Sequence, residues 1–345
     1  MNRICRFQIT VLTVLLVAAV LPVQATFPGR NGRIAFLLGP DIYTMKADGT
    51  DVKQLTHMGQ GRAASFESWS PDGRQIVFNE GPAPPDGDGT GELWLMNADG
   101  SNQHLVLAEP DFAEIRPSFT PDGGSVIFSR CPTDVDGTCA LYQITINGSG
   151  LQSITPFDLG IQDLAPRYSP DGSLAFTGTG RRGISCALYV QTVLDTGLRR
   201  LTPALLTARQ PDWSPDGREI AFSSHFGTPQ NKEIWVTNVE TNSFRRLTHS
   251  GNDFFNDPQD FHPSWSPQGD AIVFERDVPD PPSSGIFLIK ADGSGCRRLV
   301  ALPSASRATV SHNSKIRALG TQSANRNVKQ IETGGAMPRW GAATN

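Results

Sequence analysis

The stretch Trp213-Ser214-Pro215-Asp216-Gly217, followed by the apolar run Ile220-Ala221-Phe222, decides the fold because the chain repeats it. The Ser- or Thr-Pro-Asp-Gly turn recurs every 45 to 52 residues. The other copies begin at Ser70, Thr120 and Ser169, and a fifth copy, Ser266-Pro267-Gln268-Gly269, has Gln in place of Asp. An aromatic residue precedes each of the five turns, and a run of two aliphatic residues and Phe follows it. Sequence repeats of this length indicate one structural unit copied along the chain.

The repeated turn has a mechanism in its residue types. Pro fixes φ, Asp can accept a bond from its neighbouring backbone, and Gly adopts positive φ without strain. A third apolar run and a second tight turn, such as Ala98-Asp99-Gly100, come next, and a fourth run ends in Leu-Thr, as at Leu247-Thr248. Four short strands joined by tight turns form the blade of a β-propeller. We therefore predict an all-β propeller of four-stranded antiparallel blades.

The number of blades is less sharply specified. Repeat units are clear to about residue 302, whereas residues 303–345 hold only a degenerate copy. We predict seven blades with a thin last one, and the alternative is six blades plus a C-terminal tail. Pro338-Arg339-Trp340 matches the aromatic strand that the first unit lacks, so we expect the C-terminus to close the ring beside residues 33–36. Residues 26–345 then form a single propeller domain.

Composition excludes several classes of protein. The 345 residues include 34 Gly and 26 Pro, which argues against a helical bundle, and 38% are hydrophobic, which is too apolar for a disordered chain. The net charge is −4 and no basic run occurs, so we do not expect a nucleic-acid partner.

The first 25 residues have the pattern of a secretory signal peptide. Arg3 and Arg6 precede a nearly continuous apolar stretch over residues 9–21, and Val23-Gln24-Ala25 places small residues before a cleavage site after Ala25. An uncleaved membrane anchor is the alternative, although the apolar stretch is short for a span. We expect a mature chain without a membrane span that is secreted or periplasmic.

Export allows the cysteines to form disulfides. Four cysteines follow the signal peptide, and Cys131 and Cys139 flank a short loop that is the easiest to close. A zinc site is the alternative, but no Cys-x-x-Cys pair occurs and no His is near. We predict a disulfide between Cys131 and Cys139 and leave the pairing of Cys186 and Cys296 open.

The phrase from Trp213 to Phe222, together with Arg246-Leu247-Thr248, resembles the repeat of TolB-like β-propellers, a repeat of the WD type. Related repeats occur in the propellers of prolyl-oligopeptidase-like enzymes. The resemblance covers residues 27–302. It implies a propeller that contacts envelope partners near the opening of its central channel.

Binding residues are expected on one face of the ring. The Pro-Asp-Gly and Ala-Asp-Gly turns share a face, and the longer loops of variable length share the other, where a rigid scaffold usually carries its binding sites. These loops are rich in acids that could attract a cationic patch on a partner, or could simply be solvated. The candidate acids are Asp86, Asp88, Glu92, Asp134, Asp136, Asp253 and Asp257.

Two residues are candidates at the channel mouth. Arg116 and His262 occupy equivalent places three residues before the blade aromatic, where Ala165, Gln210 and Met337 stand in other units. Oxygen ligands at alternate positions in residues 85–92 and 134–138 permit a calcium site, although neither loop matches a known calcium motif. No other cofactor is indicated.

No catalytic motif accompanies these residues. We therefore expect an exported, monomeric, non-catalytic scaffold that binds a protein or another envelope or extracellular macromolecule through its variable loops and channel mouth. The alternative is a propeller hydrolase or lyase that cleaves a glycan in the channel with a pair of loop carboxyl groups.

Overall fold

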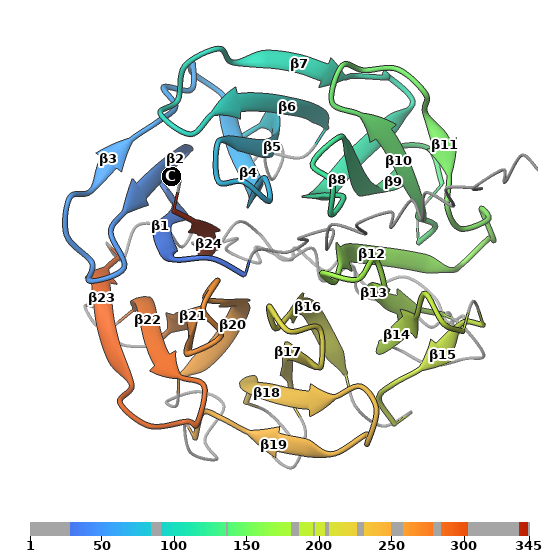
Figure 1. Cartoon of the computed structure of the whole chain (residues 1–345). Coiled ribbons are helices and arrows are strands. Elements are labelled where there is room, and N and C mark those ends of the chain that lie inside the picture. The colour runs from blue at the N-terminus through green and yellow to red at the C-terminus, as the bar shows by residue number, and fades with distance from the viewer. Residues whose placement is uncertain are drawn as a thin grey trace, which may run out of the picture.

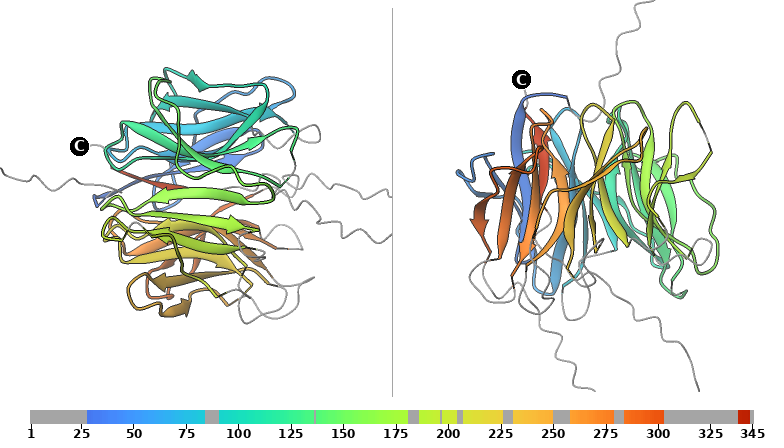
Figure 2. Two further views of the ribbon diagram at one scale, coloured as in Figure 1. Left: turned by 90° about the vertical axis from the view of Figure 1, so that its right-hand side faces the viewer. Right: turned by 90° about the horizontal axis from the view of Figure 1, so that it is seen from below.

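The computed structural model describes residues 28–83, 91–135, 137–180, 186–195, 197–203, 207–225, 231–249, 258–278, 284–302 and 338–343. Every regular element among them is a β-strand, and the strands form six four-stranded antiparallel sheets arranged as the blades of a ring (Figure 1). In side view the strands run between two opposite faces of this ring (Figure 2).

The first three blades each consist of four strands, ordered from the axis of the ring outward. Blade 1 consists of β24 (Arg339–Ala342), β1 (Asn31–Leu38), β2 (Asp41–Met45) and β3 (Lys53–Gln54). Blade 2 consists of β4 (Arg62–Trp69), β5 (Gln75–Pro82), β6 (Glu92–Asn97) and β7 (His104–Leu107). Blade 3 consists of β8 (Phe112–Phe119), β9 (Ser125–Pro132), β10 (Ala140–Thr145) and β11 (Gln152–Ser153).

The other three blades follow the same order. Blade 4 consists of β12 (Gln162–Tyr168), β13 (Leu174–Thr179), β14 (Ala187–Gln191) and β15 (Arg199–Arg200). Blade 5 consists of β16 (Ala208–Trp213), β17 (Glu219–Ser224), β18 (Glu233–Asn238) and β19 (Phe244–Arg246). Blade 6 consists of β20 (Gln259–Trp265), β21 (Ala271–Asp277), β22 (Gly285–Lys290) and β23 (Arg297–Ala301).

The repeated Phe is the centre of each blade. It is fully buried on the second strand, and the register places it opposite an aromatic residue of the third strand in every blade. The cross-strand pairs are Phe36–Tyr43, Phe78–Trp94, Phe128–Tyr142, Phe176–Tyr189, Phe222–Trp235 and Phe274–Phe287. Aromatic pairs across neighbouring strands stabilise a sheet.

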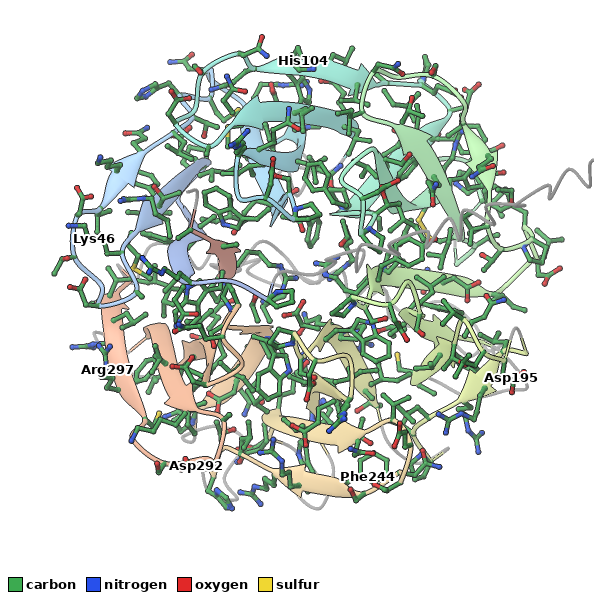
Figure 3. All side chains as sticks on the ribbon, in the orientation of Figure 1. Lys46, His104, Asp195, Phe244, Asp292 and Arg297 are labelled. Atoms are coloured by element: carbon green, nitrogen blue, oxygen red, sulfur yellow. A yellow bond between two sulfur atoms is a disulfide. The ribbon has the colours of Figure 1, made fainter. Side chains whose placement is uncertain are left out.

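No blade has a hydrophobic core of its own. The six core clusters each combine residues of two neighbouring blades, from blades 1 and 2 around to blades 6 and 1. Side chains fill the spaces between the blades, and labelled residues such as His104 and Phe244 lie at the outer edge (Figure 3). Each blade therefore depends on its neighbours for burial.

The Ser-Pro-Asp-Gly turn is a small hydrogen-bonded unit. Ser70 Oγ donates to Asp72 Oδ1 at 2.7 Å and accepts from the Gln75 amide at 2.9 Å, while Gly73 has φ of 68°. In the fifth copy, where Gln268 replaces Asp, Ser266 Oγ donates instead to Asp270 Oδ1 at 2.7 Å. In this turn the carboxylate that accepts from the Ser hydroxyl therefore comes from a residue two positions further along the chain.

The Leu-Thr ends of the outer strands, and Ile154-Thr155 in blade 3, are also structural. In four blades the Thr Oγ1 accepts, at 2.9 Å, the backbone N–H of the residue that begins the apolar run of the third strand. These residues are Thr56, Thr155, Thr202 and Thr248. In blade 1 the Thr56 hydroxyl also donates to the buried Asp41 at 3.0 Å. The Thr therefore joins the outer strand to its neighbour beyond the short ladder.

The C-terminal strand closes the ring, as the sequence predicts. β24 pairs with β1, with Trp340 opposite Ile34 and Arg339 opposite Ala35. A Cβ on Gly341 would lie 2.5 Å from the Trp69 ring, so the strand packs closely on blade 2 as well. Blade 6 packs directly on blade 1.

The predicted all-β propeller is confirmed, with six blades instead of seven. Because blades 6 and 1 share a core cluster, no blade lies between them. Of the residues assigned to the degenerate last unit, 303–337 and 344–345 lie outside the described part of the chain, and β24 belongs to blade 1. The predicted signal peptide, residues 1–25, lies outside it too. Within the described ranges no helix is long and apolar enough to cross a membrane.

The closing strand gives a stability prediction. Trp340→Ala removes a buried side chain from the cluster between blades 6 and 1, so we expect the free energy of unfolding to fall by about 3–5 kcal/mol. Urea unfolding monitored by circular dichroism measures the change. The control is Leu105→Ala on the outer strand β7, where the side chain is 48% exposed and the cost should stay below about 1 kcal/mol. Equal unfolding midpoints for the two variants would contradict a closing role for Trp340.

Candidate functional site

The inner strands connect two different faces of the ring. Five of them end at a Pro-Asp-Gly turn or its equivalent, as β4 does, which begins at Arg62 and ends at Trp69. The sixth, β24, ends on the same side, where Ala342 pairs with Asn31. We call the side where inner strands begin the loop face, and the side where they end the turn face. The inner strands surround the axis of the ring.

Arginine–carboxylate pairs occupy the loop face of blade 2. Arg62 donates to Glu80 at 2.9 Å and to Glu92 at 2.7 Å. Glu92 Oε2 also accepts from Trp94 Nε1 at 2.9 Å. Glu92, a candidate binding residue from the sequence, is therefore held within its own blade by a cation and an indole.

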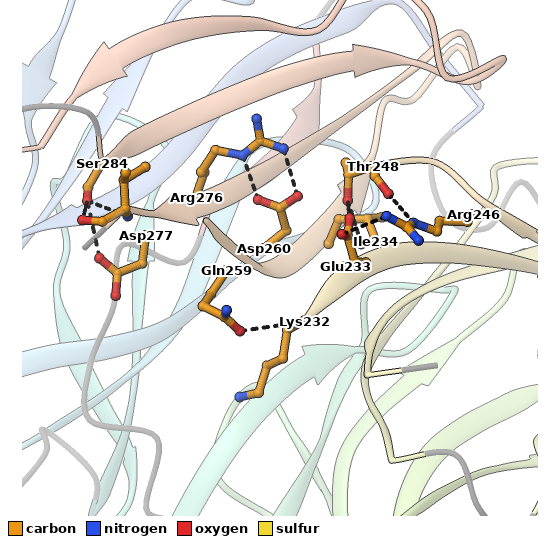
Figure 4. Close-up of polar contacts among 11 residues, drawn as sticks. Lys232, Glu233, Ile234, Arg246, Thr248, Gln259, Asp260, Arg276, Asp277 and Ser284 are labelled. Carbon is orange, nitrogen blue, oxygen red and sulfur yellow. Dashed lines mark hydrogen bonds and ion pairs between the residues drawn. The ribbon is translucent and has the colours of Figure 1, made fainter. Parts of the chain in front are cut away.

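The same pairing recurs on blades 5 and 6 (Figure 4). Arg276 binds both carboxylate oxygens of the buried Asp260, at 2.7 and 2.8 Å. Buried Glu233 accepts from Arg246 at 3.0 Å and from Thr248 at 2.7 Å. On blade 3, Arg130 contacts Glu109 and lies 3.7 Å from Glu114. Bidentate arginine–carboxylate geometry is the strongest form of such a contact.

These pairs change the interpretation of the acidic loop face. Many of its acids are neutralised by arginines, so the described part of this face carries little unpaired negative charge beyond exposed residues such as Asp111 and Asp134. Five of the candidate acids lie outside the described residues, namely Asp86, Asp88, Asp136, Asp253 and Asp257.

Arg116 and His262 share a backbone feature that the sequence did not reveal. Both have positive φ, 56° and 50°, as do Phe66, Ala165 and Gln210 at the equivalent positions. At each of these positions the register between the inner and second strands shifts, which is a β-bulge. The bulge exposes a backbone N–H to the preceding blade: Arg116 N donates to Asn79 Oδ1 at 3.1 Å.

His262 lies in a buried hydrogen-bonded chain. Gln210 Nε2 lies 2.7 Å from His262 Nε2, and His262 Nδ1 lies 3.1 Å from Glu275 Oε2. Because an amide nitrogen can only donate, the network assigns an accepting Nε2 and a protonated Nδ1. Ser223 Oγ in turn donates to Gln210 Oε1 at 2.8 Å. Both ring nitrogens are engaged, so the predicted mouth residue is part of the wall between blades 5 and 6.

Arg116 is likewise held against a neighbouring blade. Its guanidinium lies 4.5 Å from the centroid of the Phe66 ring, in cation–π geometry. The side chain is half-buried. The sequence-predicted pair Arg116 and His262 therefore share an equivalent position in blades 3 and 6 but do not form one site.

Glu67 is an unusual buried carboxylate next to the axis. Proline occupies the position two residues before the aromatic in every other unit, at Pro117, Pro166, Pro211, Pro263 and Pro338. Glu67 is fully buried, and neither carboxylate oxygen has a hydrogen-bond partner among the described residues. Burial raises the pKa of Glu67 to about 8, although the charges of Arg339 and Arg167 oppose this shift.

Two arginines and an aspartate lie one residue further along the inner strands. Arg167 Nη1 donates to the carbonyl oxygens of Pro166 and Pro117 at 2.9 and 3.3 Å. Asp212 Oδ2 accepts from the Trp265 amide at 2.8 Å, and its Oδ1 lies 3.8 Å from Arg167 Nε. Arg339 Nη1 donates to Pro263 O at 3.2 Å. These side chains join neighbouring blades at the turn face.

Of the four cysteines in the described ranges, two form a disulfide and two are free thiols. Cys131 on β9 and Cys139, just before β10, are joined in a disulfide, while Cys186 is a buried free thiol and Cys296 an exposed one. No group of three His, Cys, Asp or Glu within the described ranges is placed to hold a metal ion. Of the two loops predicted to permit calcium binding, residues 85–90 of the first and Asp136 of the second lie outside those ranges.

Sequence reasoning missed Glu67, Arg167, Asp212 and Arg339. The sequence does contain a signal for these residues. When the repeats are aligned on their aromatic residues, the column two positions before the aromatic holds Pro in every unit except at Glu67. The adjacent column has Ser in three units and charged residues in the other three. Such columns mark positions next to the axis, where side chains from all blades approach one another.

Known proteins share this architecture and part of this sequence. Residues 158–335 match the family described as TolB beta propeller domain. An uncharacterised protein of Agrobacterium fabrum is 27% identical over 244 residues, covering 68% of this chain and 75% of that protein. The Tol-Pal system protein TolB of Francisella tularensis subsp. mediasiatica is 27% identical over 229 residues, covering 53% of this chain and 50% of the relative.

A solved structure extends the comparison to the fold. TolB from Acinetobacter baumannii superposes with a TM-score of 0.63 at 22% identity, covering 92% of this chain and 67% of that one. At this identity the likeness shows the fold alone. The chain spans about half the length of the Francisella relative, so the activity of that whole protein is not transferred by the match.

Glu67 gives a prediction about pH. Its folded pKa lies above the usual value of 4.5, so its stabilising contribution is complete below pH 4.5 and is lost as pH rises through about 8. Glu67→Gln removes this loss. We expect the variant to gain about 1–3 kcal/mol relative to the native chain between pH 5 and pH 8.5, the penalty typical of an unsatisfied buried polar group.

Urea unfolding of both proteins at the two pH values measures this difference. Glu114 is present in both and also has its pKa raised to about 8 by burial, so its effect cancels in the comparison. A stability difference that is the same at both pH values would show that Glu67 does not titrate in this range.

Proposed function

Because the chain belongs to the TolB beta propeller domain family, we propose that it is an exported, non-catalytic propeller that binds a protein or another envelope macromolecule through its loop face and the adjoining end of the axis. The proposal includes cleavage of the signal peptide after Ala25 and a secreted or periplasmic location. The relatives that carry the name Tol-Pal system protein TolB support an envelope partner.

The proposal rests on the observation that the side chains best suited to catalysis are already bound by other residues of the protein. His262 has Gln210 and Glu275 on its two ring nitrogens, and a general base needs a nitrogen within reach of its substrate. Arg62 and Arg276 bind carboxylates of the scaffold. These contacts favour a rigid support for binding loops over a reaction centre.

The strand ends at the loop face are also held rigidly, which suits a surface that recognises a partner. The disulfide between Cys131 and Cys139 restrains the loop that carries exposed Asp134, and the ion pairs hold the strand ends from which the other loops leave. The candidate acids Asp86, Asp88, Asp253 and Asp257 lie close to these anchored ends along the sequence. An acidic set on a fixed frame would attract a cationic surface, and salt would weaken this attraction.

A Pal-type protein from the same source is the first partner to test, as the names of the relatives suggest. The mature chain, residues 26–345, is immobilised and the soluble domain of the Pal-type protein is titrated over it. In the test variant Asp86, Asp88, Asp253 and Asp257 are changed to Asn. We expect at least a tenfold rise in Kd for this variant and a loss of affinity with added salt.

A charge-matched control makes the same change on the turn face, where the acids are exposed. It carries Asp99→Asn, Asp195→Asn, Glu240→Gln and Asp292→Asn, which keep an acceptor oxygen at each position, and it should bind like the native chain. Equal affinity of the two variants would place recognition elsewhere. If the Pal-type protein does not bind, crosslinking in an envelope fraction tests other partners.

The enzymatic alternative is tested separately. Turnover of oligosaccharides by the purified mature chain would contradict the non-catalytic part of the proposal. Loss of that turnover in the four-residue loop variant would then locate the carboxyl groups responsible.

A further inference from the structure

A pocket opens at the turn-face end of the axis, opposite the loop face. Its wall includes the residue that immediately precedes the aromatic in each of the six inner strands, so every blade contributes one side chain. In order around the ring they are Arg339, Ser68, Ser118, Arg167, Asp212 and Ser264. The following aromatic residues of five strands also line the pocket, together with Ser266, Pro215 and Pro267 of the turns; these aromatics are Trp69, Tyr168, Trp213, Trp265 and Trp340.

The ring of six is rich in hydrogen-bond donors. It holds two guanidinium groups and three hydroxyls but one carboxylate. Arg339 is 92% buried, since only 8% of its surface is exposed, and its Nε has no hydrogen-bond partner among the described residues. A buried donor of this kind costs free energy unless a ligand or water accepts from it.

The charges around the pocket are also unbalanced. Arg167 and Arg339 line it together with Asp212, and Asp212 is 3.8 Å from Arg167. Glu67 and Arg116 lie near enough to act on the same groups. Burial, followed by the charge of Arg339, lowers the pKa of Arg167 to about 9. Burial also lowers the pKa of Arg339. Two buried guanidinium groups therefore line the pocket with one carboxylate, Asp212, which leaves their positive charge incompletely compensated.

We propose that this ring of side chains is a binding site for a carboxylate group, with Arg339 and Arg167 as the charged donors and the Ser68 and Ser118 hydroxyls as additional donors. A guanidinium presents its N–H groups in a planar fork that matches a carboxylate. Asp212 lies beside Arg167, 3.8 Å from its Nε, and its negative charge repels a carboxylate and limits the affinity. The group could belong to a small free acid or to the end of a peptide chain.

This site is separate from the loop face that carries the proposed function. The pocket is lined by the ends of the inner strands, whereas the loops leave from their beginnings. The described residues that line the pocket all lie at the turn-face end of the axis, and the two tests change different residues, so failure of either proposal leaves the other standing.

Calorimetric titration of the folded mature chain with succinate, at pH 7 and constant ionic strength, tests the site. Saturable binding to one site is expected. Arg339→Gln and Arg167→Gln should each raise the Kd at least tenfold, the change expected for losing one charge-assisted hydrogen bond. Arg74→Gln is the matched control, because Arg74 lies on a turn of the same face with its side chain 69% exposed. It should bind like the native chain.

A third variant keeps the test decisive if an arginine variant fails to fold. Asp212→Asn keeps an acceptor for the Trp265 amide but removes the negative charge, so it should bind succinate several-fold more tightly. A short glycine peptide with a free C-terminal carboxylate, compared with its amide, distinguishes a chain end from a free acid.

The outcomes separate clearly. Tighter binding by Asp212→Asn and weaker binding by the arginine variants support the site, with either succinate or the free-acid peptide. Absence of saturable binding by both probes, or equal Kd values for native chain, Asp212→Asn and the folded arginine variants, would overturn it.

Discussion

The whole structure depends on one constraint, which is that no blade buries its apolar residues by itself. Each core cluster is shared between two neighbouring blades, so the chain gains its full burial only when the ring is closed. The closing contact is the pairing of β24 with β1, which brings the last and the first strand of the chain into one sheet. The long sequence separation makes this contact entropically costly, and burial of Trp340 and Ile34 offsets the cost.

The repeats differ from one another where a contact can be made by another residue. When the fifth turn has Gln268 in place of Asp, Asp270 supplies the carboxylate that the Ser hydroxyl needs. The bulge amide of one blade is bound by Asn79, that of the next by Ser129, and that of blade 6 by Gln210. The fold therefore requires a hydrogen bond at each of these turn and bulge positions, whereas the residue that provides it can vary.

Charge is used in two ways in this molecule. On the loop face arginines and carboxylates neutralise each other and anchor strand ends, as Arg276 and Asp260 do. At the axis the balance is poorer, because Glu67 has no hydrogen-bond partner within the described part of the chain and Arg339 uses only part of its guanidinium. Buried groups left unsatisfied are costly for stability, and such groups commonly mark functional positions. The axis and the loop face thus differ in how completely their buried charges and hydrogen-bonding groups are paired.

The sequence by itself determined the blade, its four strands and its turns. Turn chemistry and alternating apolar runs act over a few residues, so Pro215-Asp216-Gly217 and Phe222 could be interpreted without knowing their neighbours in space. It also indicated the closing strand, since Trp340 completes a unit that lacks an aromatic. Only the tertiary structure decided the number of blades, because that number depends on how neighbouring blades pack at an angle. It alone showed that Arg116 and His262 are bulge residues, that Glu92 is held by Arg62, and that Arg167, Asp212 and Arg339 meet at the axis. Residues from different repeats become neighbours only when the ring closes, and no spacing along the chain records which side chains then face one another.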